Sequence, residues 1–141
     1  MKIYTKTGDQ GETCLFDGSR TSKDDVRLEL IGDIDELSSY LGLIHSYIVD
    51  KKDSILFIIN DLYRLSAHLA GAKNFAIIDL STQVLKLEQS IDEMDSWLNE
   101  LTTFIYPIGS VSIATINIAR TICGVTIKTR LLGSEISIIQ V

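Results

Sequence analysis

The residues best suited to hold a ligand lie near the start of the chain, in the segment TKTGDQGET. The segment combines hydroxyl groups, a lysine and two glycines, at Thr5, Lys6, Thr7, Gly8 and Gly11. These residue types can bind a phosphate chain, because glycine lets backbone N–H groups approach an anion closely and lysine supplies positive charge. The segment is not a Walker A loop, since a glutamate follows its second glycine. An ordinary turn explains it at least as well.

A second polar cluster, GSRTSK at residues 18–23, precedes the first long apolar pattern. It adds two cations and three hydroxyl groups. A solvated loop that ends in a helix cap, at Ser22 or Asp24, would also account for it. Two such clusters in one chain of net charge −6 suggest a local anion site more strongly than either cluster alone.

Arg120 interrupts an apolar stripe near the end of the chain. The stripe consists of residues at steps of three and four, which share one face of a helix: Ile113, Ile116, Arg120, Cys123 and Ile127. A guanidinium buried in such a face needs a partner, because an unpaired buried charge is strongly destabilising. We therefore expect an acidic group or an anion beside Arg120.

Asp35, in the first apolar pattern, is the candidate partner of Arg120. The pair has two interpretations, a structural ion pair or a polar site at a helix interface that is open to an anionic ligand. No acidic residue occurs in residues 105–133, whereas Arg120, Lys128 and Arg130 do. This helix is locally positive in an acidic protein, which favours a phosphate-bearing partner.

Composition and charge exclude several classes of protein. The net charge of −6 argues against general binding to nucleic acid or to anionic membranes, because proteins that bind either of these usually have a basic surface. Cys14 and Cys123 are too few and too far apart for a disulfide framework, and His45 and His68 have no second metal ligand nearby. The longest apolar run, residues 55–59, is far shorter than the roughly 20 residues of a membrane-spanning helix. These features predict a soluble, cytoplasmic protein with one domain, residues 1–141.

Four amphipathic helices must position these residues. The apolar steps predict helices over about 25–49, from a cap at Ser54 to about 71, from a cap at Ser81 or Thr82 to about 101, and from about 111 to 132. The third has an apolar stripe with strict heptad spacing, which is typical of packing in a bundle. The stripe consists of Val84, Leu87, Ile91, Met94, Leu98 and Leu101. The fold class is all-α.

The first predicted helix carries more apolar surface than one core-facing stripe needs. The additional residues are Leu28, Ile31, Tyr40, Leu43 and Tyr47. Either this helix lies centrally within its own bundle, or it forms a contact between identical subunits. The sequence favours neither interpretation.

Several blocks of the sequence resemble one enzyme family. The blocks KIYTKTGDQGET, LFDGSRTSKDDVRLE and GDIDELSSYLG closely resemble, in this order and spacing, the amino-terminal half of the PduO-type ATP:cob(I)alamin adenosyltransferases. The likeness continues through NDLYRLSAHLA and FIYPIGS as far as ARTIC. It implies an up-and-down bundle of four to five helices that assembles as a homotrimer, with ATP bound between subunits. The implied enzyme transfers the 5′-deoxyadenosyl group of ATP to cob(I)alamin and releases triphosphate.

The resemblance also implies roles for individual residues. Residues 1–24 would form an extended segment that binds the triphosphate of ATP. Its contacts would come from Thr5, Lys6, Thr7, Gly8, Gly11 and Lys23, and Mg²⁺ would neutralise further charge. Arg120 and Asp35 match a pair that joins neighbouring subunits beside the nucleotide. Phe104 matches a phenylalanine that displaces the lower axial ligand of cobalamin, although its position before the Pro107 turn also suits a core anchor.

After ARTIC the sequence departs from the family pattern. Gly124 and Ile127 stand where the family has an arginine and a glutamate that contact ATP, and the family's Y-L-N-R-L-S-D block does not occur. Loss of a charge-assisted contact typically costs about 1.5 to 3 kcal/mol. Three functions stay open. They are a working adenosyltransferase in which Lys128 or Arg130 replaces part of the charge, a weakened or inactive ATP-binding or regulatory trimer, and a helical bundle without a ligand.

Overall fold

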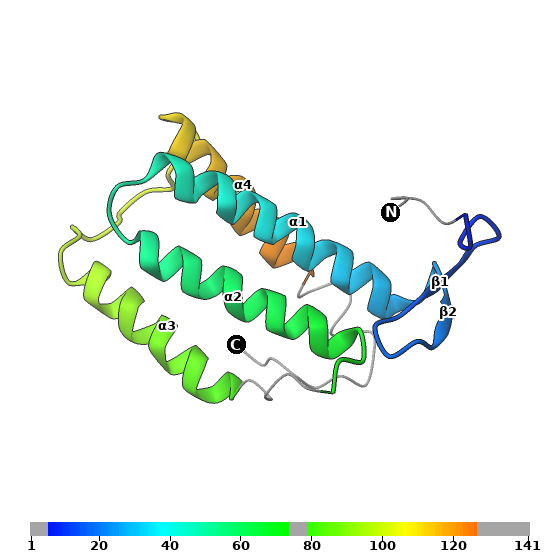
Figure 1. The fold of residues 1–141 in the computed structure, drawn as a ribbon. Coiled ribbons are helices and arrows are strands. Elements are labelled where there is room, and N and C mark those ends of the chain that lie inside the picture. The colour runs from blue at the N-terminus through cyan, green and yellow to red at the C-terminus, as the bar shows by residue number, and fades with distance from the viewer. Residues whose placement is uncertain (1–5, 74–78, 127–141) are drawn as a thin grey trace.

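The computed structural model describes residues 6–73 and 79–126, and within them the protein has four helices and one small hairpin (Figure 1). The elements are β1 (Glu12–Cys14), β2 (Arg20–Ser22), α1 (Val26–Tyr47), α2 (Lys52–Leu69), α3 (Leu80–Asp95) and α4 (Val111–Thr126). The predicted all-α, up-and-down architecture is confirmed, and the hairpin is an addition to it. No helix in these two ranges has the length and hydropathy needed to cross a bilayer.

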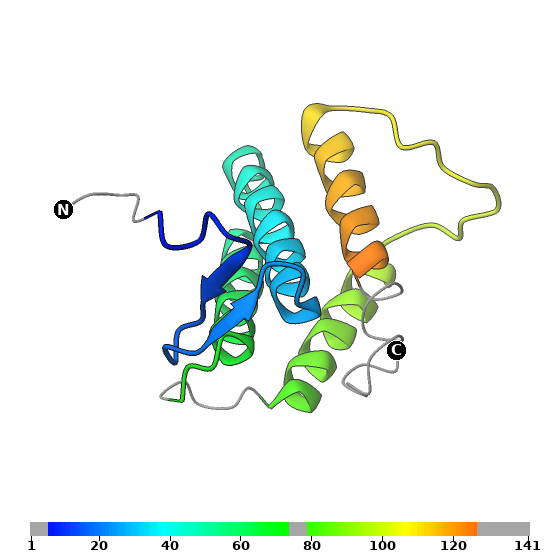
Figure 2. The ribbon, with the colours of Figure 1, turned by 90° about the vertical axis from the view of Figure 1, so that its right-hand side faces the viewer.

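Helix α1 is the centre of the packing. It lies between α2 and α4, and successive helices run in opposite directions (Figures 1 and 2). Leu41 and Ile44 of α1 form the core with Ala119 of α4, and Ile58 and Leu62 of α2 pack against them. This central position explains much of the apolar surface of α1. The contact between identical subunits is not tested by a single chain.

Asp25 fixes the start of α1. One carboxylate oxygen accepts a hydrogen bond from the backbone N–H of Arg27 at 2.8 Å, and the other accepts from the Thr21 hydroxyl at 2.6 Å and from Arg27 Nη2 at 2.8 Å. These bonds, with that from the Arg27 side chain the strongest, hold the pKa of Asp25 well below its usual range. The predicted caps, Ser22 and Asp24, are wrong. Ser22 belongs to β2, and Asp25 directly precedes the first helical residue.

Helix α2 begins earlier than the predicted cap at Ser54. Its first residue is Lys52, so Ser54 lies inside the helix. Lys51, with φ 61°, is the residue before the helix and makes no side-chain cap bond. The other end is a Schellman turn in which Gly71 has φ +86°. Its N–H donates to His68 O at 3.0 Å, and that of Ala72 donates to Ala67 O at 2.9 Å.

Helix α3 differs most from the prediction. Asp79, rather than Ser81 or Thr82, caps it by accepting a hydrogen bond from the Thr82 N–H at 3.4 Å. The helix ends at Asp95, so the last two members of the heptad stripe, Leu98 and Leu101, lie beyond it. The helical members Leu87, Ile91 and Met94 stay exposed, at 42%, 58% and 41%. These three side chains are therefore not buried by other described residues, as packing in a bundle would require.

Two contacts beside α2 and α3 involve long charged side chains. Lys51 Nζ lies 3.1 Å from Glu93 Oε2, and the Lys86 ammonium lies 5.1 Å from the centre of the Phe57 ring. An exposed ion pair contributes little to stability. These two contacts therefore add only weakly to the packing of α3 beside α2 (Figure 1).

Candidate functional site

Residues 6–11, called the leader here, rest on a β-hairpin that the sequence did not reveal. Strands β1 and β2 are antiparallel, with Thr13 opposite Thr21. The Lys23 N–H donates to Gly11 O at 2.8 Å and so continues the pairing into the leader. The two polar clusters of the sequence are thereby brought side by side. Strands of three residues have no periodicity to read, which is why this hairpin was missed.

Gly8 and Lys23 are in close contact. A Cβ atom at Gly8 would lie 2.9 Å from the Glu12 carbonyl oxygen and 3.4 Å from both Cε and Nζ of Lys23. Only glycine fits this approach without a shift of the backbone. In the part of the chain that the structure describes, Lys23 forms no ion pair with a carboxylate. Its ammonium group is therefore available to an anion placed on the leader.

Arg20 ties the leader to the hairpin, a role the sequence did not reveal. Its Nε atom lies 3.0 Å from Glu12 Oε2, and its Nη2 group donates to Thr7 O at 3.1 Å. Lys6 has a left-handed backbone with φ 59°, and the side chains of Lys6 and Thr7 are exposed. Arg20 thus fixes the loop while Lys6 and Thr7 face outward. A charge pair across β1 and β2 would have been the only sequence signal.

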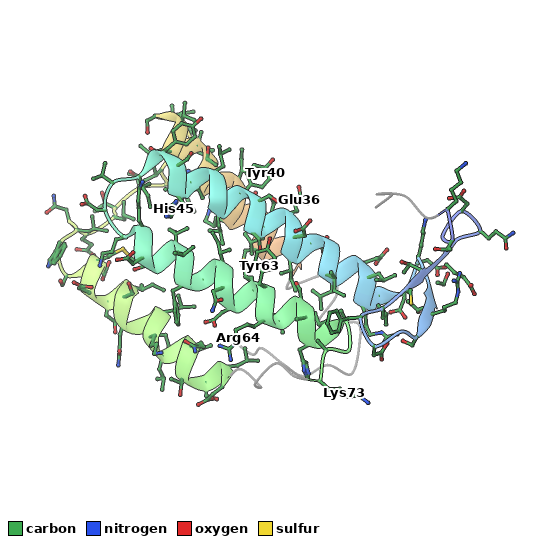
Figure 3. The ribbon with its side chains drawn as sticks, viewed as in Figure 1. Glu36, Tyr40, His45, Tyr63, Arg64 and Lys73 are labelled. Carbon is green, nitrogen blue, oxygen red and sulfur yellow. The ribbon has the colours of Figure 1, made fainter. Side chains whose placement is uncertain are left out.

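Asp35 lies at a surface pocket of about 370 Å³ between α1 and α2. The pocket is lined by Leu28, Ile31, Gly32, Asp35, Ser38, Tyr63 and Ser66. Tyr63 of α2 lies on the side of that helix facing α1 (Figure 3). The Ser38 hydroxyl donates to Ile34 O at 2.7 Å and is buried, whereas Asp35 is exposed. The carboxylate can therefore receive a cation from outside this chain.

Arg120 is not buried in this chain, so the prediction of a buried guanidinium is wrong here. Helix α4 packs on α1 through Thr115 and Ala119, each 5% exposed, while Ile113, Ile116 and Arg120 face outward. Small side chains let the two helices approach closely, and this decides which face is buried. Among residues 6–73 and 79–126 Arg120 has no ion pair with Asp35, so the predicted pair is not formed within one chain. A pair between subunits stays a prediction.

Phe104 is fully exposed, at 103%, on the connection between α3 and α4. Its interpretation as a core anchor is therefore wrong. Its neighbours Leu101, Ile105 and Ile108 are 70%, 72% and 76% exposed. Isolated exposed apolar side chains are common, but a contiguous run of this kind marks a binding surface.

The candidate residues form two separate groups in one chain. The hairpin and α4 lie on opposite sides of α1 (Figure 2), so Lys23 and Arg120 do not converge. Thr5, Ile127 and Lys128 lie outside the described residues. Within those residues no group of three or more His, Cys, Asp and Glu side chains is arranged to hold a metal ion.

Comparison with known proteins finds similar sequences along most of the chain. The sequence model of the family described as cobalamin adenosyltransferase matches residues 3–124. A cobalamin adenosyltransferase from Cupriavidus metallidurans is 37% identical over 125 residues, covering 86% of this chain and 67% of the relative. A corrinoid adenosyltransferase from Bacillus subtilis is 38% identical over 131 residues, covering 86% and 66%. The chain thus spans about two thirds of these relatives.

A solved structure shows the same similarity in three dimensions. It is a variant of a PduO-type ATP:corrinoid adenosyltransferase from Lactobacillus reuteri complexed with cobalamin and ATP. It aligns with a TM-score of 0.77 and 28% identity, over 89% of this chain and 72% of that one.

The sequence similarity also extends to an animal protein. A human corrinoid adenosyltransferase is 34% identical over 133 residues, covering 86% of this chain and 53% of its own length.

Proposed function

Because the chain belongs to the cobalamin adenosyltransferase family, we propose that it transfers the 5′-deoxyadenosyl group of ATP to cob(I)alamin. In this reaction an electron pair of cobalt(I) forms the bond to ribose C5′, the C5′–O bond breaks, and its electrons leave with triphosphate. The corrinoid supplies the nucleophile, so the protein's task is to hold and orient two substrates. The described residues offer a separate surface for each.

The observation that carries the proposal is the close contact between Lys23 and Gly8 of the leader. An ammonium group lies beside a loop whose close backbone approach requires Gly8, and Lys6 and Thr7 face outward from the same loop. This combination of cation, hydroxyl and glycine suits a triphosphate. We assign Gly11 and Thr5 to the same site.

Magnesium fits this site as an ion brought by the nucleotide. Mg²⁺ commonly binds through one or two carboxylates together with substrate phosphates and water. The leader and hairpin lack a preformed cluster of carboxylates among their described residues. Bound Mg²⁺ would neutralise charge on the triphosphate, while Lys6 and Lys23 hold its oxygens.

A homotrimer would complete the nucleotide site. In one chain Asp35 opens onto a surface pocket and Arg120 faces outward from α4, so each is available to a second copy. We propose that Arg120 of one subunit pairs with Asp35 of the next, beside the triphosphate. Lys128 is proposed to add positive charge to the same nucleotide site. We propose that the reaction takes place in the cytoplasm, where the free thiols Cys14 and Cys123 would stay reduced.

The corrinoid surface is assigned to the connection between α3 and α4. Phe104 is exposed among other apolar side chains there, and a corrin ring offers a broad face to cover them. We propose that Phe104 occupies the lower face of the ring in place of its axial ligand. Covering this run also removes apolar surface from water.

A second candidate function, an ATP-binding or regulatory module without turnover, is favoured by one observation. Gly124 lies exposed on the last described turn of α4, about one turn beyond Arg120, where the family pattern has an arginine. A missing cation weakens the hold on the triphosphate. ATP would then bind but would be poorly oriented for attack.

One assay separates the two functions. The protein is incubated with MgATP and chemically reduced cob(I)alamin, and adenosylcobalamin is followed by its absorbance. Turnover excludes the inert module. If no product forms, calorimetry with MgATP distinguishes the binding module, which releases heat, from a bundle without a ligand. Mass measurement in solution tests the trimer separately.

A further inference from the structure

The turn at the end of α2 holds the hairpin that carries the leader. The Phe16 N–H donates to Ala70 O at 3.0 Å, which is the carbonyl of the helix C-cap. Leu15, one residue earlier, is only 7% exposed. The hairpin is thus joined to the end of α2 by a backbone hydrogen bond, and its Leu15 side chain is buried.

The hairpin loop fits closely against Gly71. Asp17 lies so near that a Cβ atom at Gly71 would be 2.8 Å from both Cγ and Oδ2 of its carboxylate. Asp17 is itself fixed, because its Oδ1 accepts hydrogen bonds from the Ser19 N–H at 2.9 Å and from the Ser19 hydroxyl at 2.6 Å. The carboxylate cannot turn away without losing these bonds.

Charge supports the same contact. The hydrogen bonds from Ser19 hold the pKa of Asp17 below its ordinary value, with smaller contributions from Lys73 and Arg27. Lys73 follows the end of α2 near the hairpin (Figure 3), and Arg27 belongs to the first turn of α1. Asp17 therefore interacts with the end of one helix and the start of another.

We propose that Gly71 is a positioning residue for the nucleotide, acting through Asp17 and the hairpin on the leader. The inference rests on the proposed function, since it concerns the same phosphate site. The path is continuous: Gly71 contacts the hairpin loop, the loop closes β1 and β2, and β2 leads to Lys23 beside Gly8. The end of α2 thus sets where the leader presents its phosphate-binding groups. It does not touch ATP or the corrinoid.

The test is Gly71→Ala. Its methyl group would push Asp17 and displace the hairpin, and the expected result is a rise in the Kd and KM for MgATP of about tenfold, because small displacements of positioning groups are costly. The KM for the corrinoid should stay unchanged. Unchanged ATP binding in a folded Gly71→Ala protein would overturn the proposal.

Two control variants distinguish the effect of the new contact with Asp17 from the effect of backbone strain at Gly71. Gly18→Ala imposes similar backbone strain, at φ +85°, where a Cβ would meet nothing within 4 Å, and should affect ATP less. Asp17→Gly removes the atoms that the new methyl group meets. The effect of Gly71→Ala should therefore shrink in the Asp17→Gly background, and full additivity of the two changes would contradict the proposal.

Hydrogen exchange tests the attachment of the hairpin to the end of α2 without an activity measurement. In Gly71→Ala, amides of residues 6–23 should exchange faster than in wild type, while those in the middle of α1 should not change. Leu15→Ala, which leaves the α2 turn intact, should do the same and serves if Gly71→Ala does not fold. Unchanged exchange in both variants would refute the attachment of the hairpin to the end of α2. If the wild-type protein binds no ATP but the exchange of the variants changes as expected, the proposed function fails and the attachment is still supported.

Discussion

The two ends of the candidate site differ in how completely one chain builds them. At the leader end, backbone pairing, the Arg20 contacts and the Phe16 bond to α2 fix a polar loop. At the other end, Phe104 and Arg120 extend outward, and among the described residues no ion pair holds the arginine. The difference teaches that the proposed phosphate loop is organised within one chain, whereas the proposed corrinoid and subunit-contact surfaces would each need a second component. Four substitutions test this contrast.

Phe104→Ala should have the largest effect and should separate the two ends cleanly. Loss of an aromatic side chain from a packed contact costs about 3 to 5 kcal/mol, so adenosylation should fall by more than about 100-fold. ATP affinity should not change, because the leader is distant from this connection. Leu101→Ala, on the same exposed connection, is the matched control and should be much milder. Equal losses in the two variants would show that Phe104 has no particular role.

Reversal of one charge at the proposed subunit contact should come next. Asp35→Arg places two cations together, and loss of a close charge pair at an interface costs about 2 to 5 kcal/mol. The trimer mass, measured by light scattering, should be lost at micromolar protein. Arg120→Asp in the same chain should restore it. Glu36→Gln, on the neighbouring position of α1, controls for a change of charge. Failure of the double variant to reassemble would argue against this pairing.

Lys6→Ala tests the leader end alone. Removal of a charge-assisted bond to phosphate costs about 1.5 to 3 kcal/mol, which is a loss of roughly 10- to 100-fold in ATP affinity. Calorimetry with MgATP measures it, and light scattering should find the trimer unchanged. Lys52→Ala, an exposed lysine at the start of α2, should leave the affinity as it is. If both lysine variants lose affinity equally, general charge rather than the leader attracts ATP.

Gly124→Arg should have the smallest effect, and it is a gain. A Cβ at this position meets nothing within 4 Å, so α4 can carry the larger side chain. If the missing cation limits the second half of the site, ATP should bind up to about tenfold more tightly. Gly124→Ala separates this from the helix stabilisation of about 1 kcal/mol that any side chain gains over glycine. Equal gains in the arginine and alanine variants would assign the whole effect to the helix.

The sequence predicted the existence of the helices well and their ends poorly. The steps of three and four in α1 are a strong signal, because its apolar residues face two neighbouring helices. The caps of α1 and α3 were missed because several Ser, Thr and Asp residues lie around the start of each of these two helices, and only the three-dimensional path selects Asp25 or Asp79. The hairpin was missed because three-residue strands show no periodicity, and because one bond that holds it, from the Phe16 N–H to Ala70 O, joins residues far apart in the sequence.

The buried face of α4 was predicted wrongly for a different reason. Isoleucines at 113 and 116 are more apolar than Thr115 and Ala119, so a scale of hydrophobicity selects the wrong stripe. Close approach of two helices rewards small side chains instead. The leader residues, by contrast, were selected from the sequence by the chemistry of glycine, lysine and hydroxyl groups, which does not depend on packing, and their role in binding phosphate stays a prediction.

The contact of Ala119 with Leu41 and Ile44 has a further consequence. Arg120 is the next residue along the helix, so the thickness of the side chain at 119 determines how far its guanidinium projects from the bundle. A relative with a bulkier residue at 119 would hold α4 farther out and present the same cation at a different height. The reach of this arginine is therefore adjustable by a methyl group that never meets a substrate.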